Sequence, residues 1–216
     1  MTIEVTAFRW VPTFAQGYVR DLRVRWALEE AGLAYEARLI GGEARGSEDY
    51  RAWQPFGQVP AYRDGEVEMF ESGAIVLHIA AKSEALSPRD EAGRARVLTW
   101  VIAALNSIEL HVQNLVHLDA FHAGEAWTKE RRPQAEAMLT GRLAALGAWL
   151  DGKDYLEGRF TAGDLMMTTV LRELVDSGVL SRFPNLDAYR RRCEGRPAFG
   201  RALEAQMQPF RETAPA

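Results

Sequence analysis

The chain has 216 residues, which is enough for one large domain or two small ones. Hydrophobic residues make up 47% of it and charged residues 26%, which is typical of a globular protein and excludes a largely disordered one. The formal net charge of −4 gives no general attraction to nucleic acid or acidic membranes, so we expect neither as a partner. Because no apolar run approaches the ~20 residues needed to span a bilayer, and no signal peptide is evident, we predict a cytoplasmic protein.

The first 82 residues alternate between strand and helix patterns. A strand is predicted at 3–9, a helix from Val19 that stops at Gly32, a second strand at 35–40, a short helix at 47–53, a hairpin at 61–63 and 67–70, and a helix from Glu71. Asp64-Gly65 is a strong hairpin turn signal between the last two strands. The order βαβαββα predicts a small mixed sheet with helices on its faces.

Only helical patterns follow this first region. Residues 83–90 contain Ser87-Pro88 and are predicted to be a linker. Beyond them, apolar residues at helical spacing predict helices over 97–108, 138–150 and 165–175, with two more between 187 and 206. We therefore expect an α/β domain at 1–82 and an all-α helical bundle domain at 91–216.

Metal and disulfide chemistry are not indicated. A single cysteine, Cys193, excludes an internal disulfide and a Cys-x-x-Cys redox pair, so we expect a structural thiol. His111, His117 and His122 share one region, but their spacing matches no known zinc pattern. No metal is predicted.

Three short motifs stand out. Gln58-Val59-Pro60 follows a turn and precedes the hairpin. Glu71-Ser72 lies where a strand gives way to a helix, whose first N–H groups attract anions. Thr161 and Asp164 form an N-terminal capping box, a folding element to which we assign no catalytic role. With these motifs and this element order, the chain resembles the soluble glutathione S-transferases over nearly its whole length.

The resemblance implies a thioredoxin-like N-terminal domain that binds glutathione, followed by the helical domain. It implies a cis bond at Pro60 and antiparallel pairing of the Val59 N–H and C=O with the cysteinyl backbone of glutathione. Glu71 would meet the amino group of the γ-glutamyl end, and Ser72 its α-carboxylate. Gln58 is expected near the glutathione backbone.

The reaction that the resemblance implies is attack of the glutathione thiolate on a small apolar electrophile, as in detoxification, by a homodimer that uses glutathione as co-substrate. One alternative is a binding or scaffold protein that keeps the fold without turnover. Another is a glutathione-dependent isomerase, dehalogenase or peroxidase.

The group that activates the thiol is left open between two hydroxyls. Family members use a Tyr at the end of the first strand, or a Ser or Cys before the first helix, but here the strand ends in Phe8-Arg9-Trp10 and no Ser or Cys precedes Ser47. Counting from the strand selects Thr13, and counting back from the helix end selects Tyr18, which we expect at the helix start. Arg9 and Trp10 are further candidates.

Two further groups of residues follow from the resemblance. The candidates for binding the glycyl carboxylate are Arg45, Arg51, Trp53 and Gln54. The candidates for lining the electrophile pocket are Phe14, Asn106, Glu109, His111 and Asn114.

Overall fold

Four strands and three α-helices make up most of residues 3–80 in the computed structural model, which describes residues 2–213. In chain order they are β1 (Ile3–Phe8), α1 (Asp21–Ala31), β2 (Tyr35–Ile40), α2 (Glu48–Trp53), β3 (Ala61–Asp64), β4 (Val67–Phe70) and α3 (Ser72–Ala80). The strand order in the sheet is β2-β1-β3-β4, with β1 and β2 parallel and the other pairs antiparallel. The predicted order βαβαββα is therefore confirmed.

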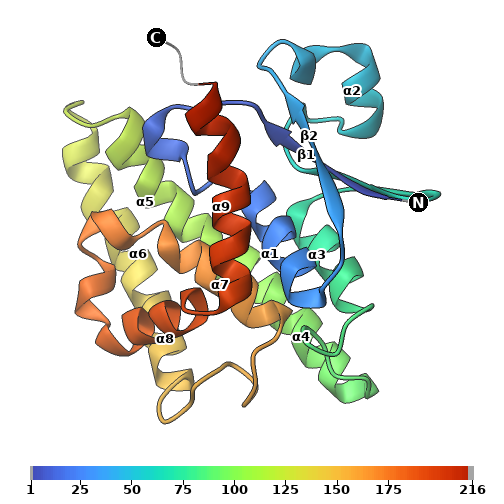
Figure 1. Ribbon diagram of the computed structural model, residues 1–216. Coiled ribbons are helices and arrows are strands. Elements are labelled where there is room, and N and C mark those ends of the chain that lie inside the picture. Colours follow the sequence, from blue (N-terminus) through green and yellow to red (C-terminus); the bar gives the residue numbers. More distant parts are fainter. Residues whose placement is uncertain (1, 214–216) are drawn as a thin grey trace. The chain divides into compact units, whose positions relative to one another are not determined.

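The two faces of β1 pack against different helices. Val5 and Ala7 point to one face and are 0% and 2% exposed. Thr6 points to the other face, where its hydroxyl meets that of Tyr50 on α2. Because side chains alternate along a strand, α2 covers the Thr6 face and the packed pair of α1 and α3 covers the opposite one (Figure 1).

Helix α1 begins later than the sequence predicts. Its first residue is Asp21, and the three residues before it form a turn in which Val19 and Arg20 accept from the N–H groups of Leu22 and Arg23. The helix ends as expected at Gly32, whose φ of 66° is left-handed and suits a residue without a β-carbon.

The last helix, α9 (Pro197–Glu212), packs on α1 (Figure 1). The rings of Trp26 and Phe199 meet edge to face at 4.9 Å, and Arg196 forms a bidentate ion pair with Glu30 at 2.6 and 2.7 Å. By packing, the chain divides into Met1–Ser87 with Arg196–Ala216 and, separately, Pro88–Gly195. The sequence pattern predicted that all of 91–216 belongs to the helical domain. Helix α9 instead belongs to the first unit, because its apolar face packs on α1.

The second unit, Pro88–Gly195, is helical. Its α-helices are α4 (Glu91–Ala103), α5 (Leu110–Phe121), α6 (Thr128–Trp149), α7 (Ala162–Arg172) and α8 (Pro184–Glu194). A π-helical segment, Ala104–Glu109, joins α4 to α5, so that the predicted long helix is continuous. Cys193 is buried within α8. No helix within residues 2–213 combines the length and the apolarity needed to cross a bilayer.

Two polar clusters hold this second unit together. The predicted capping box is present at α7: Gly163 N–H donates to the Thr161 hydroxyl, and Thr161 N–H donates to Asp164 at 2.9 Å. Asp164 also accepts from Leu156 N–H and the Tyr189 hydroxyl, so its role is structural.

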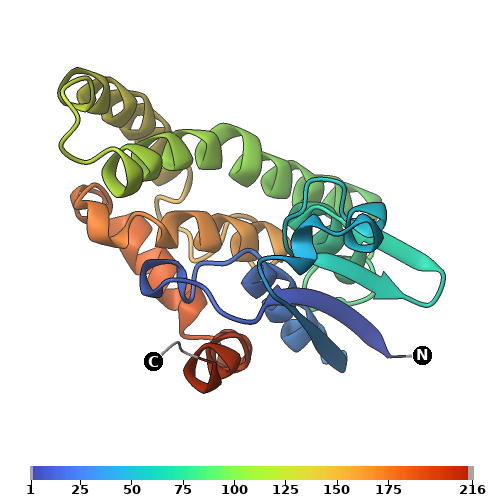
Figure 2. The ribbon, with the colours of Figure 1, turned by 90° about the horizontal axis from the view of Figure 1, so that it is seen from above.

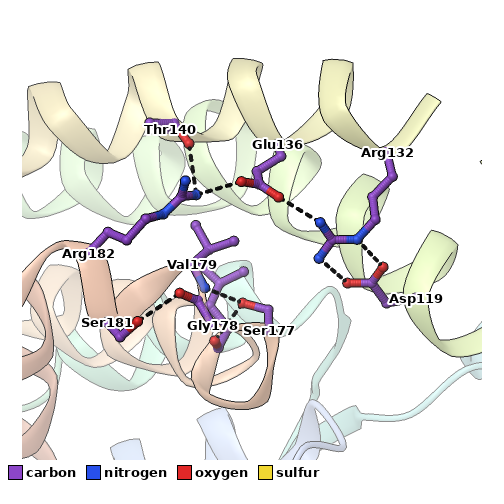
Figure 3. A network of polar contacts seen from close by, with 10 residues as sticks. Asp119, Arg132, Glu136, Thr140, Ser177, Gly178, Val179, Ser181 and Arg182 are labelled. Carbon is purple, nitrogen blue, oxygen red and sulfur yellow. Dashed lines mark hydrogen bonds and ion pairs between the residues drawn. The ribbon is translucent and has the colours of Figure 1, made fainter. Parts of the chain in front are cut away.

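The second cluster joins α5, α6 and the segment before α8 (Figure 3). Arg132 on α6 makes a bidentate pair with Asp119 at 2.6 and 2.9 Å and a further bond to Glu136. Glu136 in turn pairs with Arg182 at 2.8 Å. Shared carboxylates and a bidentate guanidinium make such a network more stabilising than an isolated surface pair.

Candidate functional site at one edge of the sheet

The strand register brings two of the sequence motifs together. Ala61 on β3 pairs with Phe70 on β4, so Pro60, directly before β3, and Glu71, directly after β4, lie at the same end of the hairpin. Val5 pairs with Tyr62 in antiparallel fashion, so the carboxyl end of β1 points to this same edge. Figure 2 shows the loop after β1 running out from it. The predicted glutathione-binding residues 58–60 and 71–72 therefore belong to one edge, which the loop 9–20 also leaves.

A chain of hydroxyl groups holds the backbone on both sides of Val59. Ala61 N–H donates to Thr6 Oγ1 at 2.7 Å, and the two hydroxyls of Thr6 and Tyr50 lie 2.9 Å apart. The Tyr50 hydroxyl donates to the Gln58 carbonyl at 2.6 Å. Since each hydroxyl has one proton, Thr6 donates to Tyr50, which leaves a directed relay. We call this set, Ala61–Thr6–Tyr50–Gln58, the hydroxyl relay.

Among the described residues, the Val59 N–H and C=O have no hydrogen-bond partner, and the relay does not engage them. The relay engages the C=O before Val59 and the N–H after Pro60, while the Val59–Pro60 bond is cis, as the family resemblance implies. Burial raises the pKa of Tyr50, so its hydroxyl remains a proton donor throughout the neutral range. The segment 58–61 is therefore fixed by contacts that do not compete for Val59.

The turn before this segment is organised by Gln54. Its side chain is 2% exposed, and its Oε1 accepts from the N–H groups of Phe56 and Gln58 at 2.8 and 3.1 Å. Trp53 is also buried, and its Nε1 donates to the Tyr62 carbonyl. The side chains of Gln54 and Trp53 are thus used in bonds within the protein. Of the four candidates for binding the glycyl carboxylate, the two exposed arginines are therefore favoured.

Arg45 and Arg51 lie beside the turn at Gly57. The φ of Gly57 is +62°, and a β-carbon there would lie 2.8 Å from the Arg45 carbonyl oxygen and 3.9 Å from Arg51 Nη2. The close approach and the positive φ both require glycine at this position. The Arg51 guanidinium therefore lies near the residue that precedes Gln58.

Glu71 has an unusual backbone conformation. Its φ is +69° and its ψ 110°, and among the described residues it is the one non-glycine residue with positive φ. Such conformations cost about 1–3 kcal/mol and gather at functional sites. Glu71 is exposed, so packing does not explain why a carboxylate stands here.

Ser72 begins α3 and is 5% exposed. Its hydroxyl oxygen lies 3.4 Å from Arg23 Nη1 on α1, and Arg23 is itself buried. A guanidinium and a helix N-terminus therefore face the same oxygen, and both favour an anion. The contact also brings the first turn of α1 close to the Glu71-Ser72 motif.

The two candidate hydroxyls lie in the loop between β1 and α1. Thr13 starts a short 3-10 turn, Thr13–Ala15, and is exposed. Tyr18 is 37% exposed, and its N–H donates to the Ala15 carbonyl. Because α1 begins at Asp21, Tyr18 precedes the helix rather than opening it. Phe14, 64% exposed, lies in the same loop.

The other predicted pocket residues belong to the second unit. Asn106 and Glu109 lie in the π-helical segment, and His111 and Asn114 lie in α5. Glu109 is buried, whereas Asn106 is exposed. Single-turn π-helices often occur at functional sites. These residues remain predictions for the electrophile pocket.

Three residues of the site were missed by the sequence analysis. Thr6 and Tyr50 form the hydroxyl relay, and Arg23 faces Ser72. Thr6 carried a weak signal, since it is a small polar residue within a strand flanked by buried apolar neighbours. Arg23 carried none, because arginine on a helix is usually solvated. No group of three or more His, Cys, Asp or Glu side chains within residues 2–213 is arranged to hold a metal.

Comparisons with known proteins identify relatives of this chain and of its fold. The family model of the glutathione S-transferase N-terminal domain matches residues 21–87. Glutathione S-transferase 3 of Zea mays is 31% identical over 205 residues, covering 87% of this chain and 90% of its own length. A glutathione S-transferase of Hyoscyamus muticus is 28% identical over 202 residues, covering 85% and 92%. A crystal structure of a Burkholderia graminis glutathione transferase with two bound glutathione molecules per subunit superposes with a TM-score of 0.82 at 24% identity, covering 94% and 88%.

The backbone of Glu71 generates a testable prediction. Glycine adopts positive φ without the steric cost, so Glu71→Gly should raise the free energy of unfolding in urea by up to ~2 kcal/mol, after the entropy cost of glycine is subtracted. The matched control is Glu66→Gly, at an exposed turn position with ordinary φ, which should lose about 0.5–1 kcal/mol. Equal losses in both variants would show that Glu71 carries no strain.

Proposed function

We propose a glutathione-conjugating reaction for this chain, which belongs to the glutathione S-transferase family. The observation that carries the proposal is the strand register, which sets the fixed but unused Val59 backbone beside the Glu71-Ser72 turn. Together they offer the free N–H and C=O of Val59 for pairing with a peptide and, next to them, the anion-binding N-terminus of α3. A γ-glutamyl tripeptide presents the complementary groups in the same order.

Each part of glutathione finds a complementary group in this pose. The Val59 N–H and C=O pair with the cysteinyl backbone, as when an extended peptide adds to a strand. The Glu71 carboxylate meets the γ-glutamyl amino group, and the Ser72 hydroxyl and N–H meet the α-carboxylate at the start of α3. Gln58 lies along the backbone of glutathione. Arg51, beside Gly57, is the cation that we assign to the glycyl carboxylate.

Activation of the thiol requires one good donor. A free cysteine thiol has a pKa of about 8.5, so lowering it by about two units takes roughly 2.7 kcal/mol. A hydrogen bond to the charged sulfur supplies about 1.5–3 kcal/mol, and a helix N-terminus adds up to ~2 kcal/mol. Tyr18 is our candidate, because it lies in the turn that directly precedes α1, with Thr13 as the alternative.

The reaction consumes a reduced thiol and an electrophile. The sulfur forms the new bond, the leaving group departs with the electron pair of the broken bond, and the thiol proton goes to solvent. We assign a small apolar electrophile as the second substrate. Since thiols stay reduced in the cytosol, we propose a cytoplasmic location.

A homodimer is the assembly that we propose. Leu98 and Ile102, one turn apart on α4, are 48% and 43% exposed, and Phe56 is 64% exposed. Exposed apolar residues at helical spacing are typical of a surface that a second copy covers. Sedimentation velocity of the purified chain tests this proposal: a dimer is expected, and a monomer at micromolar concentration would contradict it.

The activity is tested with glutathione and a chlorinated nitroaromatic as the electrophile. The wild type should form the conjugate, and Tyr18→Phe should lower kcat/KM by about 10- to 100-fold, because a hydrogen bond to the thiolate is lost. The apparent pKa of the pH–rate profile should rise in the same variant. Thr13→Val is the matched control and should behave like wild type.

Other outcomes separate the alternatives. A large loss in Thr13→Val with none in Tyr18→Phe would transfer the role to Thr13. Glutathione binding by calorimetry without turnover would indicate a scaffold protein, and turnover only with a different electrophile class would indicate an isomerase, dehalogenase or peroxidase. Absence of glutathione binding at millimolar concentration would refute the proposal.

A further inference from the structure

Several hydrogen bonds lie within the loop of residues 9–20, which carries Thr13 and Tyr18, and at its start Arg9 N–H donates to the Ile40 carbonyl on β2 at 2.9 Å. Ala15 and Tyr18 N–H donate to carbonyls three residues earlier, and Gln16 Nε2 donates to the Val11 carbonyl at 3.0 Å. Gly17 lies within it with φ of +81°. These turns define the path of the loop between its attachment to β2 and the start of α1.

Helix α9 adds an attachment at the end of the loop through Gln206. This side chain is 1% exposed, and its amide nitrogen donates to the Val19 carbonyl at 3.0 Å and to Asp21 Oδ1 at 2.7 Å. Both amide protons are thereby used at the junction between the loop and α1. Within the described residues, Gln206 Oε1 has no hydrogen-bond partner. An apolar residue would avoid this cost, so the two donated bonds are the feature that glutamine uniquely supplies here.

The rest of α9 reinforces the same contact. A β-carbon on Gly17 would lie 3.4 Å from Leu203 Cδ1 and 4.0 Å from Met207 Sδ, so both side chains border the loop. At the far end, the Thr213 hydroxyl lies 2.9 Å from the Arg9 carbonyl oxygen and 2.7 Å from that of Pro209, between which its single proton is shared. Helix α9 therefore touches the loop near its start, at Gly17 and at its end.

Helix α9 is itself firmly held. Arg196 pairs with Glu30, Arg201 pairs with Glu29 at 2.6 Å, and Phe199 packs on Trp26, which is fully buried. All of these contacts are to α1, the helix that the loop enters. The loop is thus clamped between two elements that are rigidly joined to each other.

We propose that Gln206 is a positioning residue for thiol activation: it fixes the Val19 backbone and so the placement of Tyr18 beside the sulfur of glutathione. The inference rests on the proposed function. Gln206 does not touch glutathione in this account, so its removal should affect the reactivity of the thiol and leave the anchors at Val59, Glu71 and Ser72 intact. A misplacement of about 1 Å in a reacting group can cost ~100-fold in rate.

The test compares Gln206→Met with Gln208→Met. Methionine keeps the length of the side chain and removes the amide donors. Gln208 lies on the same helix, is exposed, and bonds only to Glu212 among the described residues, so its variant controls for a change on α9 itself. Gln206→Met should lower kcat by about 10- to 100-fold and raise the apparent pKa of the bound thiol, with KM for glutathione changed less than about twofold. Gln208→Met should match wild type.

A second readout needs no turnover. Amide hydrogen exchange at Tyr18 and Leu22, whose N–H groups bond at either side of the clamp, should be about tenfold faster in Gln206→Met. If wild type lacks activity, the proposed function fails, while this exchange still decides whether the clamp exists. Unchanged kcat, thiol pKa and exchange in a folded Gln206→Met would overturn the proposal, as would equal losses in kcat and glutathione affinity.

If Gln206→Met does not fold, the variant Thr213→Val tests whether contacts from α9 position the loop. Thr213 is exposed and lies at the end of α9, so its variant should retain the fold. It loses the contact to Arg9 at the start of the loop. The expected result is a fall of about two- to fivefold in kcat at unchanged KM, by the same positional argument. Kinetics identical to wild type would overturn the proposal in that case.

Discussion

The hydroxyl relay from Ala61 through Thr6 and Tyr50 to Gln58 is the constraint on which the site depends. It connects β1, α2, Ala61 of β3 and the segment before β3 by bonds of 2.6 to 2.9 Å, and Thr6, Tyr50 and Ala61 are buried. Buried hydroxyls must find partners, and here they satisfy each other while holding the chain on both sides of Val59. The Val59 N–H and C=O are held in place but not hydrogen-bonded within the described residues. They are suited to pair with a short peptide, because this segment loses little conformational entropy on binding.

The remaining parts of the first unit serve this edge in different ways. The β3–β4 register delivers Glu71 and Ser72 to it, and Glu71 keeps a carboxylate there in spite of an unfavourable φ. Arg23 reaches Ser72 from α1, which α9 holds in turn. In our proposal, binding of the tripeptide rests on the sheet, whereas activation of its thiol rests on the loop and on helix α9.

Much of this organisation was predictable from local patterns. The element order, the hairpin at Asp64-Gly65 and the capping box at Thr161 each have a short-range sequence signature, the cis bond at Pro60 follows from the family resemblance, and all are confirmed. The attachment of α9 to α1 was not predictable, because it depends on side chains about 170 residues apart, such as Glu30 and Arg196. The bonds of Gln206 to Val19 and Asp21, at the start of α1, were not predictable for the same reason. Thr13 and Tyr18 remain predictions, since the loop that carries them has no family signature.

The most direct test of the account observes the Val59 amide itself. In 15N-labelled protein, saturation with glutathione should shift the Val59 amide resonance and slow its hydrogen exchange, because the N–H gains a partner in the cysteinyl backbone. Tyr50→Phe, which breaks the relay, should weaken this response together with the affinity. Glutathione that binds while the Val59 amide keeps its free resonance and exchange rate would contradict the central claim.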